Sequence, residues 1–595
     1  MQPNTPTPNG IAATKTFRNN DLARRLTAYS LFAGIVLWCA AAGAQPVVNS
    51  VSPLVGYEAS TATITGTGFN ATPANNIVHF GGALATVVTG SATSLTVAVP
   101  RGTSYMPVSV TDISTSLTGQ SPLAFLQNFP SADTGTIDFA GRTDFATGTH
   151  PSGIAIGDID GDGKPDIIIA NTGANTISVY RNLSAAPGGS ISAATFAAPV
   201  IDTVPFLCFY LALADIDGDG KLDIATAAQT DNRLVAIQNT SVPGTVSFGA
   251  QTTVAISTSG LPYALALADI DGNGQPDLLC VDFVNEQLAA FRNKSTPGTI
   301  SFSTLMTFGT AANPVHLAVQ DFDGDGKPDV AVACQSANVF QIFRNTSVLD
   351  TFDITTFAPR MDFFTSGQAP QYIMAGDIDG DGKADVIIGN RTAPFGIQVF
   401  RNTSVPGTIT LTGESAVAAH QIQGMSIGDF DGDGKPDIVV TNSMDTSVAI
   451  YRNNSTVGTP SFEPQARFAT LYGPVFPVVG DIDGDGKADI AVTNYMVNNF
   501  SILRDRNAPV AISNLQQVTD NAAIFPNPVS NWLTITTSKE TYHTYTIINS
   551  IGQQILQGAV ARGQTKVNVR TLPAGSYYVV LNGEKGDIAQ KFEKL

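Results

Sequence analysis

The sequence predicts an all-β protein of several domains, and three observations support this. Short runs rich in Val, Ile, Thr and Phe alternate with Gly, Pro and Asn along the 595-residue chain, a pattern typical of strands and turns. A nine-residue aspartate motif recurs seven times in the middle of the chain. On either side of these repeats, apolar and polar residues alternate between glycine turns, which indicates small β-sandwiches. The length alone predicts roughly four domains.

The central repeats predict a β-propeller. The motif has the form Asp-x-Asp-Gly-Asp-Gly-x-x-Asp, with one Asn replacement, and successive copies begin 52 to 57 residues apart. An apolar stretch precedes each copy, and a β-branched run, a polar turn and another strand follow it. Most units continue with Arg-Asn-x-Ser, a Pro-Gly turn and a last strand. Four-stranded blades set radially build a propeller, so we predict seven blades over residues 135–506.

The ring of blades is expected to close through its two ends. The seventh unit has strands up to about Leu503, but Arg504-Asp505-Arg506-Asn507 then breaks the pattern and no last strand follows. An extra strand precedes the first motif, at Thr136 to Phe145. If it supplies the outer strand of blade seven, the ring has no open edge. An open solenoid is the alternative.

Each aspartate motif, called an Asp loop below, offers hard oxygen ligands. In the first loop Asp158, Asp160, Asp162 and Asp166 supply carboxylates from positions 1, 3, 5 and 9, and Lys164 supplies a backbone carbonyl from position 7. Two glycines permit a sharp turn. Oxygen ligands in a tight loop suit Ca²⁺ better than Mg²⁺, which demands stricter octahedral geometry. Carboxylates this close would repel one another without a cation.

We therefore expect up to seven structural calcium ions. The predicted ligands are, loop by loop, Asp158, Asp160, Asp162, Lys164 and Asp166; Asp215, Asp217, Asp219, Lys221 and Asp223; Asp269, Asp271, Asn273, Gln275 and Asp277; Asp321, Asp323, Asp325, Lys327 and Asp329; Asp377, Asp379, Asp381, Lys383 and Asp385; Asp429, Asp431, Asp433, Lys435 and Asp437; and Asp481, Asp483, Asp485, Lys487 and Asp489.

Other interpretations of the Asp loops fit the sequence less well. An EF-hand would place Glu at position 12 between two helices, but position 12 is Ile169 in a strand pattern. Dockerin modules also follow such loops with helices. An Asp-Gly hairpin without metal explains one copy, but hardly seven copies with their carboxylates. The third loop has Asn273 in place of aspartate and is expected to bind calcium more weakly.

These units resemble the FG-GAP or VCBS repeats of integrin α-subunit propellers and bacterial surface proteins, over about residues 135–506. The resemblance rests on the aspartate motif and its period. The Phe-Gly and Gly-Ala-Pro segments of the integrin repeats are not reproduced in each blade. What the resemblance implies is structural Ca²⁺, bound by the aspartate positions of the seven loops on one face of the propeller.

The N-terminal region divides into an export signal and a small domain. Arg24 and Arg25, an apolar run and Ala42-Gly43-Ala44 have the order of a secretory signal peptide, predicted to cover residues 1–44. Residues 45–127 contain Ser52-Pro53-Leu54-Val55-Gly56 and alternating strands, and they resemble an IPT/TIG domain, which is immunoglobulin-like. That resemblance implies a spacer or interaction module. Residues 128–134 are a predicted linker.

The C-terminal region, residues 520–595, follows a predicted linker at 507–519. It contains Phe525-Pro526-Asn527-Pro528 and Leu572-Pro573-Ala574-Gly575, and it ends in a basic strand. It resembles the C-terminal sorting domain of type IX secretion substrates in Bacteroidota. The resemblance implies contact with that secretion machinery and delivery outside the cell, secreted or on the outer surface. No segment after the signal peptide is long and apolar enough to predict an integral membrane span.

Chain direction predicts which residues lie at the propeller face away from the Asp loops. The innermost strand of each blade begins about five residues before its motif, so these starts lie at the opposite face. Five aromatic residues at or beside these starts are predicted, as a ligand-binding rim around the channel, to stack on sugar rings or anchor a protein loop. They are Tyr210, Tyr263, His316, Tyr372 and Phe476. Packing between blades is the alternative.

The composition disfavours several function classes. The net charge of −18 argues against nucleic acid as a partner, but 27 of the 49 acidic residues are loop aspartates, so the charge says little about other partners. The five histidines have no metal-ligand spacing, and neither a Gly-x-Ser-x-Gly elbow nor a P-loop occurs. No catalytic residue is predicted.

The sequence therefore predicts a secreted or surface-displayed calcium-binding propeller that acts in adhesion or ligand binding, with a protein or glycan as ligand. The alternative is a carbohydrate-active enzyme resembling a polysaccharide lyase, with its site on the face opposite the Asp loops. The Asn-x-Ser sequons at Asn182, Asn239, Asn293, Asn345 and Asn402 recur at one blade position and are interpreted as turn residues rather than glycan sites.

Overall fold

The computed structural model describes most of the chain from Gln45 onward. The described ranges are 45–129, 137–184, 188–392, 396–419, 421–442, 446–506, 522–537, 542–549, 554–561, 563–570, 572, 575–583 and 588–594. The predicted signal peptide (1–44), the linker at 507–519 and most of the linker at 128–134 lie outside them. Within these ranges, no helix is long and apolar enough to cross a membrane.

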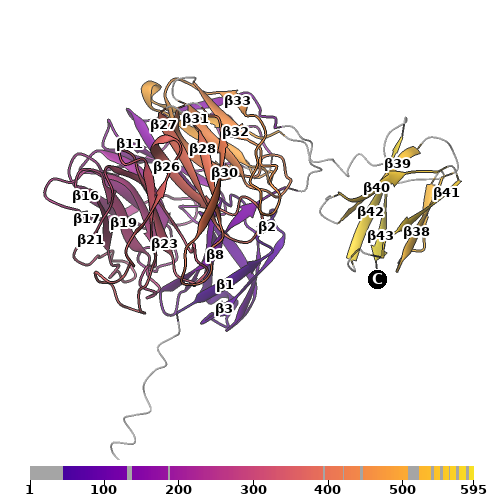
Figure 1. Ribbon diagram of the computed structural model, residues 1–595, viewed down its shortest axis with the longest axis horizontal. Coiled ribbons are helices and arrows are strands. Elements are labelled where there is room, and N and C mark those ends of the chain that lie inside the picture. Colours follow the sequence, from indigo (N-terminus) through magenta and orange to yellow (C-terminus); the bar gives the residue numbers. More distant parts are fainter. Residues whose placement is uncertain are drawn as a thin grey trace, which may run out of the picture. The chain divides into compact units, whose positions relative to one another are not determined.

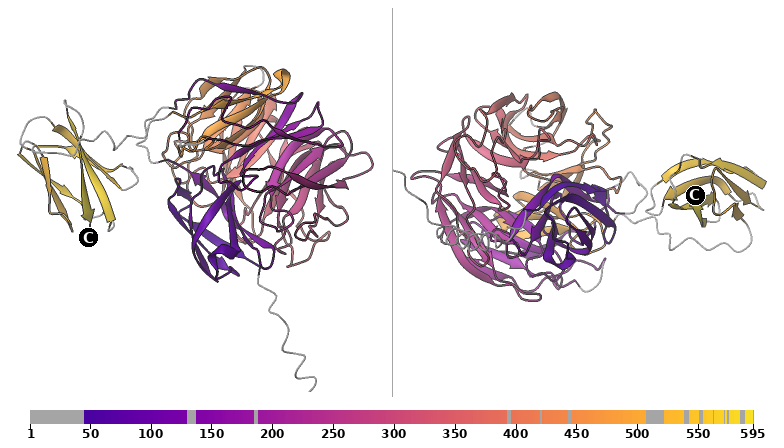
Figure 2. Two further views of the ribbon diagram at one scale, coloured as in Figure 1. Left: turned by 180° about the vertical axis from the view of Figure 1, so that it is seen from behind. Right: turned by 90° about the horizontal axis from the view of Figure 1, so that it is seen from below.

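Seven antiparallel sheets of four strands each make up the middle of the chain (Figure 1). The first strands are β10 (Pro151–Gly157), β14 (Cys208–Ala214), β18 (Pro262–Ala268), β22 (Pro314–Gln320), β26 (Gln368–Gly376), β30 (Ile422–Gly428) and β34 (Pro474–Gly480). Each first strand contacts the first strand of the next sheet, and β34 contacts β10. The sheets therefore close a ring around these innermost strands (Figure 2). The predicted all-β propeller fold is confirmed.

The other strands follow outward in chain order. The second strands are β11 (Asp166–Asn171), β15 (Asp223–Ala228), β19 (Asp277–Asp282), β23 (Asp329–Cys334), β27 (Asp385–Thr392), β31 (Asp437–Asn442) and β35 (Asp489–Asn494). The third strands are β12 (Thr176–Tyr180), β16 (Arg233–Asn239), β20 (Gln287–Phe291), β24 (Val339–Phe343), β28 (Ile397–Asn402), β32 (Ser447–Tyr451) and β36 (Asn499–Leu503). The outer strands are β13 (Val200–Thr203), β17 (Phe248–Ala255), β21 (Met306–Gly309), β25 (Met361–Phe364), β29 (Leu411–Val417), β33 (Ala466–Ala469) and β9 (Thr143–Ala146).

Burial explains the composition of the second strands. In β11 the sequence Asp-Ile-Ile-Ile-Ala-Asn is buried at every position, because neighbouring blades cover both faces of the sheet. A strand covered on both faces is apolar continuously rather than in alternation. The outer strand β13 is exposed or half-buried throughout. The hydrophobic core therefore lies between the blades, where it holds the first strands and their loops in place.

The outer strand of the last blade comes from the other end of the propeller sequence. β9 (Thr143–Ala146) pairs antiparallel with β36 (Asn499–Leu503), in the sheet order β34-β35-β36-β9. Phe139 adds a bridge to Asp505. The predicted closure by a strand that precedes the first motif is confirmed, with β9 lying at the end of the predicted range.

The N-terminal domain is built from eight strands in one folded sheet. They are β1 (Val47–Ser52), β2 (Val55–Gly56), β3 (Thr61–Thr67), β4 (Asn76–Phe80), β5 (Ala83–Ser91), β6 (Ser94–Ala98), β7 (Met106–Asp112) and β8 (Leu117–Gln127). β5 pairs with both β6 and β4, so the two halves of the sheet enclose one core that includes Ile64, Phe80 and Phe125. A short 3-10 turn, η1 (Pro73–Asn75), precedes β4.

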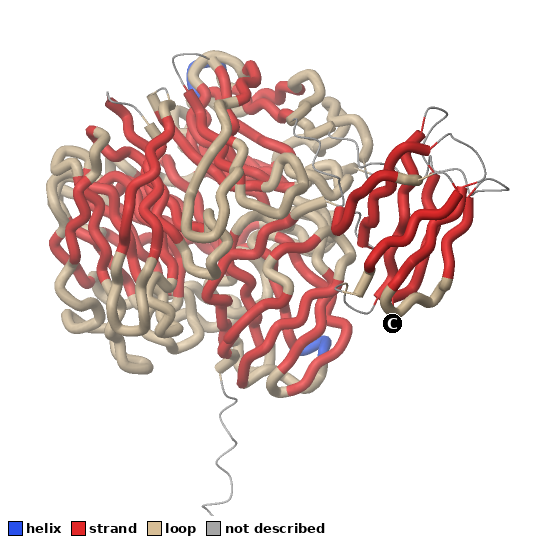
Figure 3. Tube along the Cα trace, turned by 45° about the vertical axis from the view of Figure 1, so that its right-hand side comes forward, coloured by secondary structure: helices blue, strands red, loops and turns tan. Residues whose placement is uncertain are grey.

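The C-terminal domain has two sheets around its own core. Its strands are β37 (Ala522–Phe525), β38 (Trp532–Thr537), β39 (Tyr542–Asn549), β40 (Gln554–Ala559), β41 (Gly563–Asn568), β42 (Gly575–Gly583) and β43 (Ile588–Lys594). The sheet β37-β38-β41 and the sheet β40-β39-β42-β43 share buried side chains that include Leu533, Val579 and Phe592. The predicted sandwich is confirmed. Strands and loops account for nearly all the described residues, apart from η1 and η2 (Tyr495–Val497), the short turns drawn as helix in Figure 3.

Candidate functional site

The Asp loops connect the first strand to the second in every blade. The two glycines of each loop have φ between 71° and 90°. L-residues with a side chain rarely adopt this left-handed backbone, whereas glycine does so without steric cost. The repeated Asp-Gly-Asp-Gly sequence therefore turns the chain back on itself within a few residues, and it does so on the same face of all seven blades.

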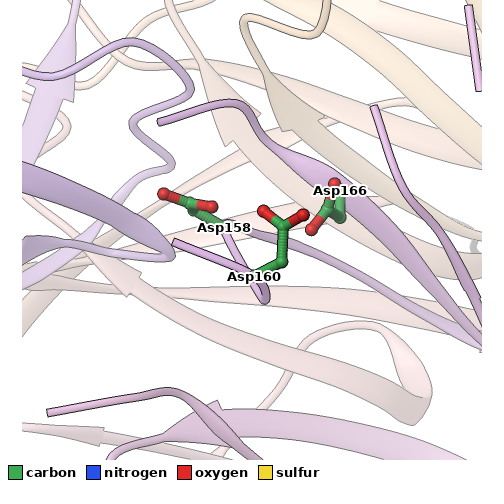
Figure 4. Close-up of side chains that lie close together, drawn as sticks. All are labelled: Asp158, Asp160 and Asp166. Carbon is green, nitrogen blue, oxygen red and sulfur yellow. The ribbon is translucent and has the colours of Figure 1, made fainter. Parts of the chain in front are cut away.

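Within a loop, the turn gathers carboxylates that the sequence predicted as metal ligands. Asp158, Asp160 and Asp166 of the first loop each offer an oxygen, and these oxygens lie within 4.8 Å of one another (Figure 4). The same positions meet in loops two, three and five. In loop four the gathered residues are those at positions 1, 3 and 5. In loops one, two, three and five, the predicted ligands at positions 1 and 3 thus lie close to the predicted ligand at position 9, at the other end of the motif.

Backbone hydrogen bonds orient these carboxylates. Asp158 Oδ1 accepts the N–H of Asp162 at 3.0 Å, and its Oδ2 accepts the N–H of Gly163 at 2.9 Å. Asp166 Oδ2 accepts the N–H of Ile159 at 3.1 Å. A carboxylate has about four acceptor sites, so oxygens held in this way keep lone pairs for a cation. Groups that fix the orientation of a ligand in this manner raise metal affinity.

Burial makes the ionised form of these carboxylates costly. The side chain of Asp166 is fully buried, and desolvation raises its pKa to about 8. Desolvation, and then the neighbouring Asp162 and Asp160 carboxylates, raise the pKa of Asp158 to about 6. A divalent cation would offset both effects, because it stabilises the charged form. The donor set contains only oxygen, which fits Ca²⁺.

The residues at position 7 turn their side chains back onto the surroundings. Lys164 Nζ lies 3.3 Å from Asp162 Oδ2, and its backbone N–H donates to Asp162 Oδ1 at 3.0 Å. In the third loop Gln275 Nε2 donates instead to the carbonyl of Ser295 at 2.8 Å. These side chains therefore make local contacts, and any role in metal binding falls to their backbone carbonyls, as the sequence predicted.

An arginine that the sequence did not single out as functional contacts the position-3 aspartate in six blades. The ion pairs are Arg181–Asp160 (3.9 Å), Arg292–Asp271 (2.5 Å), Arg344–Asp323 (3.7 Å), Arg401–Asp379 (2.7 Å), Arg452–Asp431 and Arg504–Asp483. In blade two Gln238 Nε2 donates to Asp217 Oδ2 at 3.2 Å. For five of the six arginines the signal was present in the recurring Arg-Asn-x-Ser motif, but the target lies in the Asp loop between the first and second strands of the blade.

The predicted aromatic residues come together in the middle of the ring. Tyr210 lies 4.9 Å from Phe476 and 5.7 Å from His316, measured between ring centroids. His316 stacks on Tyr372 at 3.8 Å, and Tyr210 lies 6.3 Å from Tyr263. We call these five residues, together with Phe209, the aromatic cluster. Its members come from five different blades, so side chains meet across the channel.

Phe209 was missed because strict alternation along a strand would point its side chain away from that of Tyr210, the residue selected. It lies 5.2 Å from Tyr210 and 5.8 Å from Phe476. The pairing of β14 with β15 shifts register between Cys208 and Leu211. A bulge there lets both Phe209 and Tyr210 turn toward the centre, and every other first strand carries a similar shift near its start.

Burial differs within the aromatic cluster. Tyr210 and Phe476 are buried, whereas Phe209, Tyr263, His316 and Tyr372 keep part of their surface exposed. Desolvation lowers the pKa of His316 to about 3 and raises the pKa of Tyr372 well above 10. His316 is therefore neutral near neutral pH, with Nδ1 3.1 Å from the Ile373 carbonyl. Ligand contact by these residues stays a prediction.

The N-terminal domain contacts several Asp loops directly. Hydrogen bonds join them: Asp158 N–H to the Gly82 carbonyl (2.8 Å), Gln45 Nε2 to Asp269 Oδ2 (2.8 Å), Thr118 N–H to the Gly274 carbonyl (2.6 Å), and Asp377 N–H to the Tyr105 hydroxyl (3.2 Å). Arg101 also donates to the Ile482 carbonyl at 3.2 Å. The loops of blades one, three, five and seven are therefore partly covered by this domain.

Comparison with protein families decides the identity of the repeats. The FG-GAP-like repeat matches residues 158–226, 215–280, 277–332, 321–388, 377–440 and 429–492. These overlapping matches together span more than half of the chain and include all seven Asp loops. The chain belongs to the FG-GAP-like repeat family. Each matched segment of its FG-GAP-like repeats thus includes at least one loop that gathers carboxylates at the end of a first strand.

The regions on either side of the FG-GAP-like repeats match families as well. Residues 46–125 match the IPT/TIG domain, and residues 523–594 match the secretion system C-terminal sorting domain. The sorting domain marks the chain for type IX export, to the cell surface or the medium, and it is the part that meets the secretion machinery. The predicted family resemblances and export route are confirmed.

Individual relatives of this FG-GAP-like protein are remote. Integrin alpha-4 of Xenopus laevis is 27% identical over 163 residues, which are 24% of this chain and 15% of the integrin. The chain thus spans well under a fifth of that relative.

Three solved structures are also similar. A chain in the crystal structure of BBS1N in complex with ARL6DN is 12% identical, and the match covers 63% of this chain and 98% of that chain with a TM-score of 0.39. An auxiliary nutrient binding protein from Bacteroides thetaiotaomicron is 10% identical (78% and 98%, TM-score 0.30). The Dos1 propeller is 10% identical (78% and 93%, TM-score 0.35).

Proposed function

We propose that this protein is a calcium-stabilised propeller displayed outside the cell, which binds a protein or glycan ligand on the face opposite the Asp loops. The observation that carries the proposal is the difference between the two faces. One face gathers carboxylates that are buried, hydrogen-bonded and partly covered. The other ends in a group of aromatic side chains of which four keep part of their surface exposed. Calcium fixes the loops, and the opposite face presents the ligand site.

Several observations support calcium as a structural element. The position-1, position-3 and position-9 carboxylates of loop one approach within 4.8 Å and are buried. Without a cation their mutual repulsion and desolvation would destabilise the turn. Arg181 and Lys164 neutralise part of this charge at Asp160 and Asp162, but the buried Asp158 and Asp166 carboxylates form no ion pair among the described residues. Oxygen ligands at positions 1, 3, 5, 7 and 9 are the kind that Ca²⁺ takes.

The placement of the ligand site rests on chain direction and on access. The aromatic cluster lies near the starts of the first strands, and the Asp loops follow their ends. The N-terminal domain contacts four of the loops, which reduces access from that side. Tyr263 and Tyr372 retain exposed surface, and aromatic rings are suited to stacking on sugars and to anchoring protein loops.

A glycan array probed with the intact secreted protein tests the proposal. Once a ligand is found, Tyr263→Ala and Tyr372→Ala should each weaken binding at least about tenfold, as expected for an interface hot spot. Phe364→Ala is the matched control, because Phe364 is exposed on an outer strand and should leave the affinity unchanged. Unchanged affinity in both tyrosine variants, with unaltered melting temperatures, would refute the placement of the site.

The alternative, a polysaccharide lyase, needs an acid and a base with pKa values near the working pH. The stacked pair His316 and Tyr372 is the best candidate on this face, but burial moves the two pKa values apart, to about 3 for His316 and above 10 for Tyr372. This disfavours proton transfer by the pair. Incubation with plant and algal polysaccharides, followed at the absorbance of unsaturated products, would reveal such activity.

A further inference from the structure

The asparagine of the recurring Asn-x-Ser motif, which follows arginine in five blades and Gln238 in blade two, has a role that the turn interpretation does not contain. Six of these asparagines end the third strand of a blade or lie just beyond it, and all have fully buried side chains. They are Asn182, Asn239, Asn293, Asn345, Asn402 and Asn453. A buried amide is not accessible for glycan attachment. The question is therefore what the buried amide groups bind.

Asn239 in blade two shows the arrangement. Its backbone N–H donates to Oδ1 of Asp223, the position-9 ligand of loop two, at 2.8 Å. Its side-chain Nδ2 donates to the carbonyl of Leu222 in the same loop at 2.9 Å, and to the carbonyl of Ile159 in loop one at 2.8 Å. One amide group therefore bonds two neighbouring Asp loops at once.

The hydrogen-bonded connection from Asn239 extends through Ile159 to a predicted metal ligand of loop one. Ile159 is position 2 of loop one, and its own N–H donates to Asp166 Oδ2 at 3.1 Å. The sequence of hydrogen-bonded groups is thus Asp166, Ile159, Asn239 and Asp223. It runs from the position-9 carboxylate of one loop to the position-9 carboxylate of the next, through two residues that are not predicted ligands themselves.

The same connection recurs around the ring. Nδ2 of each of the six asparagines donates to the position-2 carbonyl of the preceding loop at 2.8 Å. These carbonyls belong to Ile482, Ile159, Ile216, Ile270, Phe322 and Ile378. In the seventh blade the residue at this position is Asp505, whose N–H donates to Asp489 Oδ1 at 2.8 Å. Six of the seven junctions therefore carry an amide bridge.

We propose that these asparagines are positioning residues that couple neighbouring metal loops, so that loading one loop with calcium favours loading the next. The inference rests on the proposed calcium function. A carboxylate drawn toward a cation moves with the position-2 peptide that donates to it. The carbonyl of that peptide then determines the orientation of the asparagine side-chain amide. The backbone N–H of the asparagine in turn determines the orientation of the position-9 carboxylate in the adjoining loop. Hydrogen-bond networks carry coupling of this kind between sites, and the bridge supplies such a network.

Equilibrium dialysis of the full chain against radioactive calcium tests the coupling by counting bound ions. Asn239→Ala removes the bridge between loops one and two. It should raise the free calcium needed to fill both loops at least about tenfold, so that two ions are missing at a concentration that saturates the wild type. Ser241→Ala is the matched control. Ser241 is also buried, two residues after Asn239, and its Oγ forms hydrogen bonds with the backbone of Ser247, so no ion should be lost.

A second variant tests the coupling without altering the bridge, so that a folding defect in N239A does not decide the result. Asp219→Asn keeps the bridge and alters only a predicted ligand of loop two. Coupled loops predict that loop one then fills at higher calcium as well, whereas independent loops predict no change outside loop two. Loss of at most one ion in N239A, or an equal loss in S241A, overturns the coupling while leaving the calcium proposal intact. A wild type that binds no calcium refutes the proposed calcium function, and the coupling with it.

Discussion

The two faces of the propeller differ in how strictly they repeat. On the Asp-loop face, 27 of the 28 carboxylate positions are aspartate, and the glycines, the arginines and the bridging asparagines recur almost blade by blade. On the opposite face, the corresponding first-strand positions hold glycine in blades one and six, but Tyr210, His316, Tyr372 and Phe476 in others. A loop that has the same role in all seven blades is expected to have the same sequence in each. A single ligand site, by contrast, would need different side chains from different blades.

The difference separates features that every blade shares from features that only some blades carry. Each Asp loop holds its carboxylates by backbone hydrogen bonds, and those at positions 3 and 9 are buried, so a change there acts on the blade itself. The aromatic cluster packs across the channel, and several of its members keep exposed surface. A change there acts on one place in the molecule. The predictions below separate these two kinds of effect, from the largest to the smallest.

Removal of calcium should have the largest effect, because it acts on every blade at once. One bound ion at a hundred times its dissociation constant contributes about 2.7 kcal/mol, and several loops add together. We expect a chelator to lower the melting temperature of the intact protein by at least about 10 °C, measured by differential scanning calorimetry.

Calcium added after the chelator should restore the melting temperature, and magnesium at the same concentration should restore it much less, because Mg²⁺ fits the loop poorly. An unchanged melting temperature in excess chelator would contradict the metal assignment of the Asp loops and remove the contrast between the faces.

Acid should affect the aromatic cluster through His316. Burial lowers the folded-state pKa of His316 to about 3, below its ordinary 6.5, so the neutral form stabilises the fold above pH 6.5. This stability is lost as the pH falls from 6.5 toward 3. Between pH 6.5 and 4.5 the loss should reach at most about 3 kcal/mol, measured by urea unfolding in saturating calcium.

His316→Gln is the control for this effect, because glutamine keeps a donor for the Ile373 carbonyl but does not titrate in this range. The variant should lose less stability than the wild type over the same pH interval. Equal pH dependence in both proteins would show that the histidine does not become charged at a cost to the fold.

Replacement of Lys164 by alanine should have the smallest effect. The sequence assigns only its backbone carbonyl to the metal, and its ammonium lies 3.3 Å from Asp162 in a partly exposed ion pair. Such pairs contribute about 0–1 kcal/mol. We expect calcium affinity within about twofold of the wild type by titration calorimetry. A large loss would mean that the side chain, rather than the carbonyl, orders the loop.

Local features of this molecule could be predicted from the sequence. The period of the aspartate motif, the β-branched runs after it and the extra strand before it were sufficient for the propeller and its closing strand. The Asp-Gly-Asp-Gly spacing was sufficient to place Asp158, Asp160 and Asp166 around one point. These inferences succeed because a turn of a few residues and a buried strand are determined by their own residue types.

Features that depend on contact between distant residues could not be predicted in this way. Asn239 and Ile159 are 80 residues apart and belong to different blades, so the sequence shows that the asparagine recurs but not what it bonds. The same holds for the hydrogen bond between Gln45 and Asp269. Phe209 was missed because strict alternation places it away from Tyr210, and only the register shift of β14 brings both toward the centre.

The pairing of β9 with β36 has a consequence for the order in which the chain can be completed. β9 lies at residues 143–146 and its partner at 499–503, so during synthesis the first of these strands emerges hundreds of residues before the second. If translation stops before β36 is made, the released chain lacks the strand that pairs with β9, and the ring of blades cannot close. The sorting domain, at 523–594, lies beyond the joining strand. Any newly synthesised chain that contains the sorting domain therefore also contains β36, the strand with which β9 pairs to close the propeller.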